Sequence, residues 1–125
     1  MTPKLLIMLG AILAGIGVAA GAFGAHGLAG VLSPDRLRVY ETAVRYQLIH
    51  TLAMMIAGVL AATTPAVHVM VAGYLFLAGI ILFSGSLYLL VLTDTPWLGA
   101  VTPIGGVAWI VGWGFLALGA WKGLP

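Results

Sequence analysis

The sequence predicts an all-α integral membrane protein, a single bundle of four transmembrane helices over residues 1–125. Three observations predict this class. Of the 125 residues, 62% are hydrophobic and 6% charged, whereas an ordinary soluble domain carries about 25% charged residues. The mean hydropathy is +1.18. The charged residues also leave three long uncharged tracts, at positions 5–34, 46–93 and 95–121.

These uncharged tracts give the number of spans. A helix needs about 20 residues to cross about 30 Å of hydrocarbon. The tracts 5–34 and 95–121 therefore hold one span each, whereas 46–93 is long enough for two. The segment Ala62-Thr63-Thr64-Pro65 breaks this middle tract, so we predict a short turn there and four spans in all.

The first helix is predicted over residues 3–25, with Thr2 as its cap and Pro3 in its first turn, where a missing backbone N–H has no cost. A signal peptide is the alternative, but the apolar stretch exceeds the roughly 7–15 residues typical of one. One face carries a stripe of small residues: Gly10, Ala14, Gly17, Gly21 and Ala25. In lipid such a stripe lets helices approach closely, either within the bundle or between subunits.

The second helix is predicted over residues 35–62, after a glycine-rich turn at Gly24–Gly30. Ser33 is suited to cap this helix, and Pro34 to its first turn. The helix is longer than one span requires. We therefore expect its first third, residues 35–45, to lie at the interface or to extend beyond the membrane.

Charged residues gather on that first third. Arg38, Glu41 and Arg45 fall on one helix face, so Glu41 is expected to form an ion-pair network with both arginines. Lys4 and Lys122 lie on the opposite side of the membrane. Basic residues on both sides leave the membrane orientation undetermined.

The third and fourth helices are predicted over residues 66–92 and 102–122. Thr102 is expected to cap the fourth helix, with Pro103 in its first turn. Residues 97–101 then form an interfacial or partly re-entrant approach. The fourth helix carries a second stripe of small residues: Gly105, Ala108, Gly112 and Gly119.

Antiparallel connectivity brings the polar residues of the spans into one half of the membrane, on the side of the long turn. The candidates are His26, Arg45, Gln47, His50, Ser84, Ser86, Tyr88 and Thr102. Polar side chains in hydrocarbon are costly unless they are paired or wetted. This polar cluster therefore predicts either a hydrogen-bonded network that fixes the helix register or a small polar cavity that binds or passes a solute.

The residue inventory argues against an enzyme or a cofactor protein. The chain has no cysteine, and its histidines and acids match no standard spacing for metal ligands. His26 and His50 lie at comparable depth and could hold a haem, but there is no second such pair, and we expect no cofactor. Ser84 or Ser86 beside His50 lacks the nucleophile elbow of a hydrolase. The net charge of +2 is too small to indicate nucleic-acid binding.

Four segments resemble the YgdD/YwdK family of small bacterial inner-membrane proteins, which has a distantly similar eukaryotic transmembrane relative. They are GAFGAHGL (Gly21–Leu28), YETAVRYQLIH (Tyr40–His50), FSGSLY (Phe83–Tyr88) and TPIGG (Thr102–Gly106). The resemblance covers nearly the whole chain. It implies four transmembrane helices and a multi-pass location in the cytoplasmic membrane of a bacterium. It implies no activity, because the family is known mainly as a domain of unknown function.

The leading hypothesis is a non-enzymatic accessory or scaffold protein in a membrane assembly. Its partners are expected to be the lipid bilayer and, through the Gly/Ala stripes, a second copy or another membrane protein. The alternative is a small-solute or ion transporter or channel that uses the polar cluster. A water-filled cavity lined by Ser86 and Thr102 favours the alternative, whereas mutual hydrogen bonding in a dry core favours the scaffold.

Overall fold

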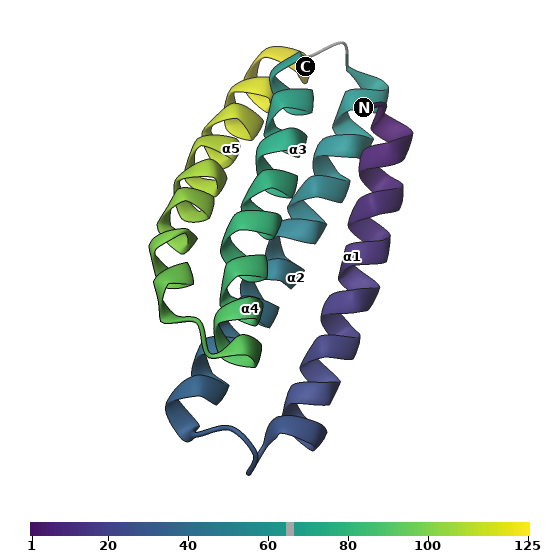
Figure 1. The fold of residues 1–125 in the computed structure, drawn as a ribbon. Coiled ribbons are helices and arrows are strands. Elements are labelled where there is room, and N and C mark those ends of the chain that lie inside the picture. Colours follow the sequence, from purple (N-terminus) through teal and green to yellow (C-terminus); the bar gives the residue numbers. More distant parts are fainter. Residues whose placement is uncertain (65–66) are drawn as a thin grey trace.

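The computed structural model describes residues 1–64 and 67–125, and these form an all-α bundle (Figure 1). Its four helical stretches, each long and apolar enough to cross a membrane, are Pro3–Leu28, Pro34–Thr63, Val67–Thr93 and Pro96–Gly123. Both termini lie at one end of the bundle, and the long turn lies at the other. The predicted class is confirmed. Pro65 of the predicted break and position 66, the predicted start of the third helix, lie outside the described residues.

The first span comprises α1 (Pro3–Phe23) and a π-helical turn, η1 (Gly24–Leu28). The predicted cap is confirmed, because the Thr2 hydroxyl accepts a hydrogen bond from the Leu5 N–H at 3.3 Å. The predicted turn from Gly24 is wrong, because the helix continues to Leu28. A Cβ on Gly24 would lie 2.6 Å from the Tyr40 ring. This glycine therefore makes room for an aromatic side chain rather than ending the helix.

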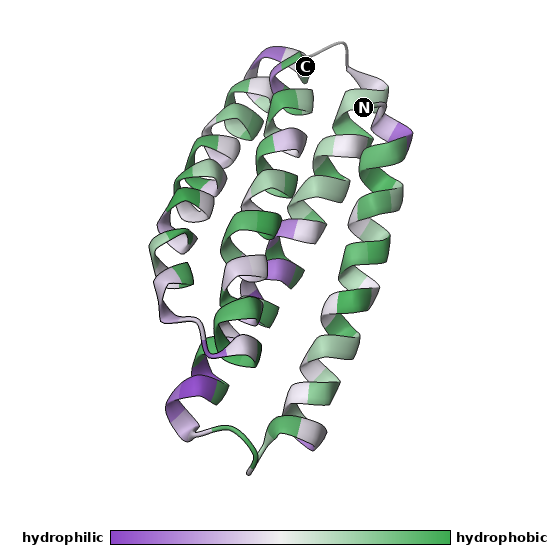
Figure 2. Ribbon diagram, in the orientation of Figure 1, coloured by the Kyte–Doolittle hydropathy of each residue, from purple (hydrophilic) through white to green (hydrophobic). Residues whose placement is uncertain are grey.

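The second span is the single helix α2 (Pro34–Thr63) of 30 residues. Ser33 caps it as predicted, accepting a hydrogen bond from the Arg36 N–H at 3.3 Å. At 1.5 Å per residue the helix is about 45 Å long, about 15 Å more than the hydrocarbon thickness. Its first turns are the most hydrophilic part of the ribbon at the long-turn end (Figure 2).

The third span is continuous through α3 (Val67–Gly79), the π-helical η2 (Ile80–Gly85) and α4 (Ser86–Thr93). The fourth comprises a 3-10 helix, η3 (Pro96–Ala100), and α5 (Thr102–Gly123).

The predicted cap at Thr102 is wrong. The cap position of α5 is Val101, which makes no side-chain cap bond. The Thr102 hydroxyl instead lies 2.7 Å from the Ser86 hydroxyl and 3.4 Å from the Leu98 carbonyl oxygen. It therefore joins α5 to α4.

The small-residue stripe of α1 packs against α2. Its members Gly10 and Gly17 are buried, and a Cβ on Gly10 would lie 3.1 Å from the Thr51 carbonyl oxygen of α2. In the reverse direction, a Cβ on Gly58 would lie 3.0 Å from the Pro3 carbonyl oxygen. The two helix backbones are thus nearly in contact, as small-residue interfaces allow.

The stripe of α5 packs against α3 and η2. Its buried members Gly105, Gly112 and Gly119 recur every seven residues. A Cβ on Gly119 would lie 3.1 Å from the Val69 backbone nitrogen of α3. The buried glycines of both stripes therefore pack against neighbouring helices of the same chain, which is one of the two roles predicted for them.

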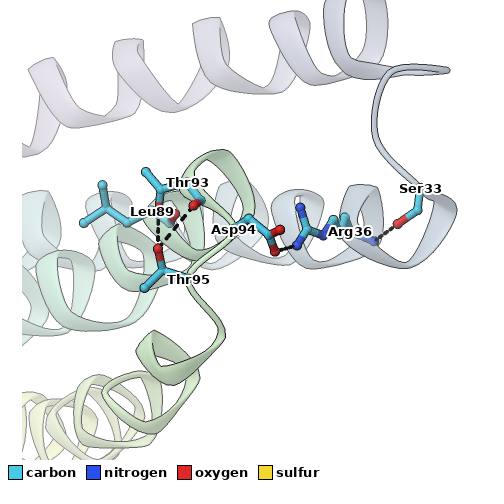
Figure 3. Close-up of polar contacts among 6 residues, drawn as sticks. All are labelled: Ser33, Arg36, Leu89, Thr93, Asp94 and Thr95. Carbon is cyan, nitrogen blue, oxygen red and sulfur yellow. Dashed lines mark hydrogen bonds and ion pairs between the residues drawn. The ribbon is translucent and has the colours of Figure 1, made fainter.

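The long-turn end is joined to the loop after α4 by an ion pair between Arg36 and Asp94 (Figure 3). Asp94 ends α4 in the left-handed region, at φ 53°. Asparagine tolerates this conformation at least as well as aspartate, whereas a β-branched residue does not.

Substitutions at Asp94 should separate the contribution of its charge to stability from the contribution of its backbone conformation. We expect Asp94→Asn to change the unfolding free energy in detergent by less than about 1 kcal/mol, because the pair is exposed. Asp94→Val should cost about 1–2 kcal/mol more, because a β-branched side chain is strained at this φ. Denaturation of the two variants in parallel tests this, and equal stability would contradict the backbone argument.

Candidate functional site

The polar cluster is organised around Gln47 of α2, which is 3% exposed. Its amide N–H donates to the Leu13 carbonyl oxygen of α1 at 2.8 Å. Its amide oxygen accepts from the Tyr88 hydroxyl of α4 at 2.7 Å. One side chain therefore links three spans, and each of the two polar atoms of its amide has a protein partner.

Two serines link the remaining spans. The Ser84 hydroxyl, fully buried, donates to the Ala43 carbonyl oxygen of α2 at 2.8 Å. The Ser86 hydroxyl lies 2.7 Å from the Thr102 hydroxyl and donates to the Phe83 carbonyl oxygen at 2.9 Å. These hydroxyls tie the third span to α2 on one side and to α5 on the other.

The contacts of His50 fix its tautomer. Its Nδ1 lies 2.7 Å from the Tyr46 carbonyl oxygen, which can only accept a hydrogen bond. Its Nε2 lies 3.1 Å from the indole Nε1 of Trp113, which can only donate. His50 is therefore neutral with its proton on Nδ1, and both ring nitrogens are in use.

Five aromatic side chains lie around His50 in stacked, tilted or edge-on contacts. With His50 they form what we call the aromatic cluster: Tyr46, His50, Phe76, Phe83, Trp109 and Trp113. The Trp109 ring lies parallel to the His50 ring, with centroids 3.7 Å apart. The Trp109 indole N–H donates to the Phe76 carbonyl oxygen of α3 at 3.1 Å. Through these contacts the aromatic cluster joins α2, α3 and α5.

Sequence reasoning missed this aromatic cluster, although one signal for it was present. Trp109 lies four residues after Gly105 and three before Gly112, which places it on the inward face that the glycine stripe marks. The ring stacks on His50 because Gly79 leaves it space. A Cβ on Gly79 would lie 2.2 Å from the indole ring.

A lateral groove runs between α2 and α5 over the aromatic cluster. Its volume is about 530 Å³, and its lining includes Arg45, Ile49 and Ile110 together with five of the six members of the aromatic cluster. A second groove of about 490 Å³ lies between α1 and the third span, with Gln47 and Tyr88 in its lining. We call them the α2/α5 groove and the α1/α4 groove. Both are lined mainly by apolar side chains.

Two predicted members of the polar cluster lie apart from it. His26, in η1, is exposed, and none of the side-chain hydrogen bonds of His50 within the described ranges reaches it. Arg45 is exposed and lies at the edge of the α2/α5 groove.

The predicted ion-pair network is not formed. Arg38 pairs with Asp35, and Glu41 takes part in none of the ion pairs of residues 1–64 and 67–125. Asp35 and Glu41 flank Arg38 at equal spacings, so helix periodicity alone cannot choose between them.

The arrangement supplies no reactive constellation within the described ranges. No three His, Cys, Asp or Glu residues there are grouped so as to hold a metal ion. Ser84 and Ser86 are hydrogen-bonded to backbone carbonyl oxygens rather than to His50. Among the described residues no buried side-chain nitrogen or oxygen lacks a hydrogen-bond partner. The polar cluster is thus internally satisfied.

The hydrogen bonds of Gln47 give a stability prediction. Tyr88→Phe should cost about 1 kcal/mol, because one interhelical bond in a membrane contributes about 0.6 and at most about 1.7 kcal/mol. Gln47→Leu should cost about twice as much, because it removes bonds to two helices. Tyr74→Phe is the matched control, since the Tyr74 hydroxyl accepts its hydrogen bond from the exposed N-terminal amine and not from a side chain of another span. Unfolding by sodium dodecyl sulfate measures all three, and equal effects of the two tyrosine variants would contradict the prediction.

Comparison with known proteins gives a consistent result. A family model described as "Protein of unknown function (DUF423)" matches residues 20–106. The chain is 53% identical over 119 residues to a UPF0382 membrane protein of Staphylococcus aureus (strain bovine RF122 / ET3-1), covering 95% of this chain and 97% of the relative. A UPF0382 membrane protein of Staphylococcus haemolyticus is 49% identical, with the same coverage. No solved structure matches the chain.

Proposed function

The chain belongs to the DUF423 family of small bacterial membrane proteins, and we propose that it is a non-enzymatic accessory or scaffold within a membrane assembly. The family resemblance found in the sequence is thereby confirmed, as is a multi-pass location in a bacterial membrane. The relatives are named as membrane proteins, without an activity. The proposal therefore depends on the geometry of the chain itself.

The observation that carries this proposal is the use of the polar groups. Four polar side chains form hydrogen bonds with neighbouring helices or with nearby backbone carbonyl oxygens: Gln47, His50, Ser84 and Ser86. In a membrane such bonds hold helices at a fixed register. A polar cluster that is already satisfied supports a structural role more than the binding of a solute.

A transporter or channel is less well supported by the same contacts. A water-filled cavity lined by Ser86 and Thr102 was expected to favour that function, and these two hydroxyls lie 2.7 Å from one another. The two grooves are lined mainly by apolar side chains.

The surface for a partner is proposed on the outer face of α1. Ala11, Gly15 and Ala19 recur there every four residues, and all three are exposed. A Cβ on Gly15 would meet nothing within 4 Å. This outer seam has the small-residue pattern through which a transmembrane helix of a partner can pack closely.

Purification from native membranes in mild detergent, with mass spectrometry, tests this function. We expect one membrane protein, or a second copy of this chain, to co-purify in a fixed ratio. Gly15→Leu should abolish that association, whereas Gly114→Leu should preserve it, because Gly114 is also outward-facing and open but lies on α5. Association that survives Gly15→Leu would contradict the outer seam. Solute or ion flux in proteoliposomes, absent from empty liposomes, would contradict the scaffold.

A further inference from the structure

We propose that the α2/α5 groove binds an anionic phospholipid of the surrounding bilayer. The headgroup phosphate lies at Arg45, and one acyl chain lies along the aromatic cluster. This inference depends on the groove alone. It holds whether or not the protein acts as a scaffold.

The first argument is charge. Arg45 is the charged residue in the lining of the groove. Arg36 is paired with Asp94 and Arg38 with Asp35, whereas Arg45 forms no ion pair with a carboxylate of the described residues. Arginine binds phosphate well because its planar guanidinium can donate two parallel hydrogen bonds. An exposed guanidinium beside an apolar groove therefore complements a negatively charged headgroup attached to a hydrocarbon chain.

The second argument is depth in the membrane. Arg45 lies eleven residues after Pro34, which is about 16 Å along α2. The helix exceeds the hydrocarbon thickness by about 15 Å, and its charged residues all lie in this first part of the helix. The Arg45 backbone therefore lies where the hydrocarbon begins, and its long side chain can extend outward to the lipid phosphates.

The third argument is the shape and chemistry of the groove below Arg45. Tyr46 and Trp109 lie nearly parallel, with centroids 5.8 Å apart and 12° between their planes. Ile49 and Ile110, on the two sides of the groove, are 45% and 73% exposed. The groove is thus open towards the bilayer along its length, and a lipid can enter laterally. Its volume lies within the range of about 300–1,000 Å³ usual for ligand sites.

Quenching of tryptophan fluorescence by brominated phospholipids tests the proposal. The starting protein carries Trp97→Phe and Trp121→Phe, so that the remaining emission comes from Trp109 and Trp113. It is reconstituted in phosphatidylcholine containing a small, equal fraction of either brominated phosphatidylglycerol or brominated phosphatidylcholine. We expect brominated phosphatidylglycerol to occupy the groove about five times as often as brominated phosphatidylcholine at the same fraction, and therefore to quench more strongly. Fivefold corresponds to the attraction of one basic residue near the membrane surface for an anionic lipid.

Two arginine variants identify the contact. Arg45→Gln should make the two brominated lipids quench equally, whereas Arg38→Gln should keep the preference, because Arg38 is tied to Asp35 and does not line the groove. Equal quenching by both lipids in the starting protein would overturn the proposal, as would a preference that survives Arg45→Gln. Weak quenching by either lipid would mean that a second copy covers the groove, which also overturns it.

Discussion

Trp109→Ala should be strongly destabilising, lowering the unfolding free energy in detergent by about 3 kcal/mol, as core truncations of large aromatic residues do. Trp109 is 3% exposed and stacks on His50 at a centroid distance of 3.7 Å. The substitution also leaves the Phe76 carbonyl oxygen without its indole donor. Equilibrium unfolding in sodium dodecyl sulfate measures the loss.

Trp121→Ala is the control for this prediction. Trp121 is 85% exposed on the same helix, so its removal should change the unfolding free energy by less than about 0.5 kcal/mol. Trp109→Phe should fall between the two, because it retains an aromatic ring and loses the hydrogen bond. A Trp109→Ala protein as stable as the Trp121→Ala protein would show that the aromatic cluster does not hold α5 in place.

Gly105→Ala should cost about 1–3 kcal/mol, the usual penalty for overpacking. The added Cβ would lie 2.5 Å from the Phe83 backbone nitrogen and 2.9 Å from the Leu82 carbonyl carbon. Backbone atoms cannot rotate away as a side chain can. The whole of α5 must therefore move away from η2, which also stretches the contact between Ser86 and Thr102.

Gly114→Ala on the same helix is the matched control. A Cβ there would meet nothing within 4 Å, so stability should be unchanged or should rise by up to about 1 kcal/mol through helix propensity. Thermal unfolding in detergent compares the two variants. If Gly105→Ala is as stable as Gly114→Ala, the close approach of α5 to η2 is not required for the fold.

The parts of the fold predicted from the sequence are those that depend on local chemistry. Ser33 and Pro34 define the start of α2 through a cap and a ring-constrained first turn, so the predicted start was one residue from the observed one. Thr2 caps α1 for the same reason. The hydrocarbon thickness sets the length of a span at about 20 residues. The lengths of the uncharged tracts therefore predicted four spans.

The parts not predicted depend on how the helices are rotated against one another. Gly24 was expected to begin a turn because it opens a glycine-rich segment. The prediction failed because the local sequence does not reveal that the Tyr40 ring lies over this glycine. The bond between Ser86 and Thr102 exists because α4 and α5 meet at that height. Helix periodicity also places two carboxylates, Asp35 and Glu41, at equal spacing from Arg38. The structure shows that Arg38 pairs with Asp35.

For the candidate site the sequence left two interpretations open, a hydrogen-bonded network or a small polar cavity. In the structure Gln47 bonds to Leu13 and Tyr88, and His50 contacts Trp113. Arg45 was expected to be tied to Glu41, and it lies instead at the α2/α5 groove.

The central claim is that the polar cluster is a dry network in which every ring nitrogen of His50 is used. Nitrogen-15 NMR of the imidazole in bilayers at neutral pH tests it most directly, with His26→Gln and His68→Gln leaving one histidine signal. We predict a neutral ring with the proton on Nδ1, bonded to the Tyr46 carbonyl oxygen, and an unprotonated Nε2 that accepts from Trp113. A proton on Nε2, or rapid exchange of the ring proton with water, would contradict the account.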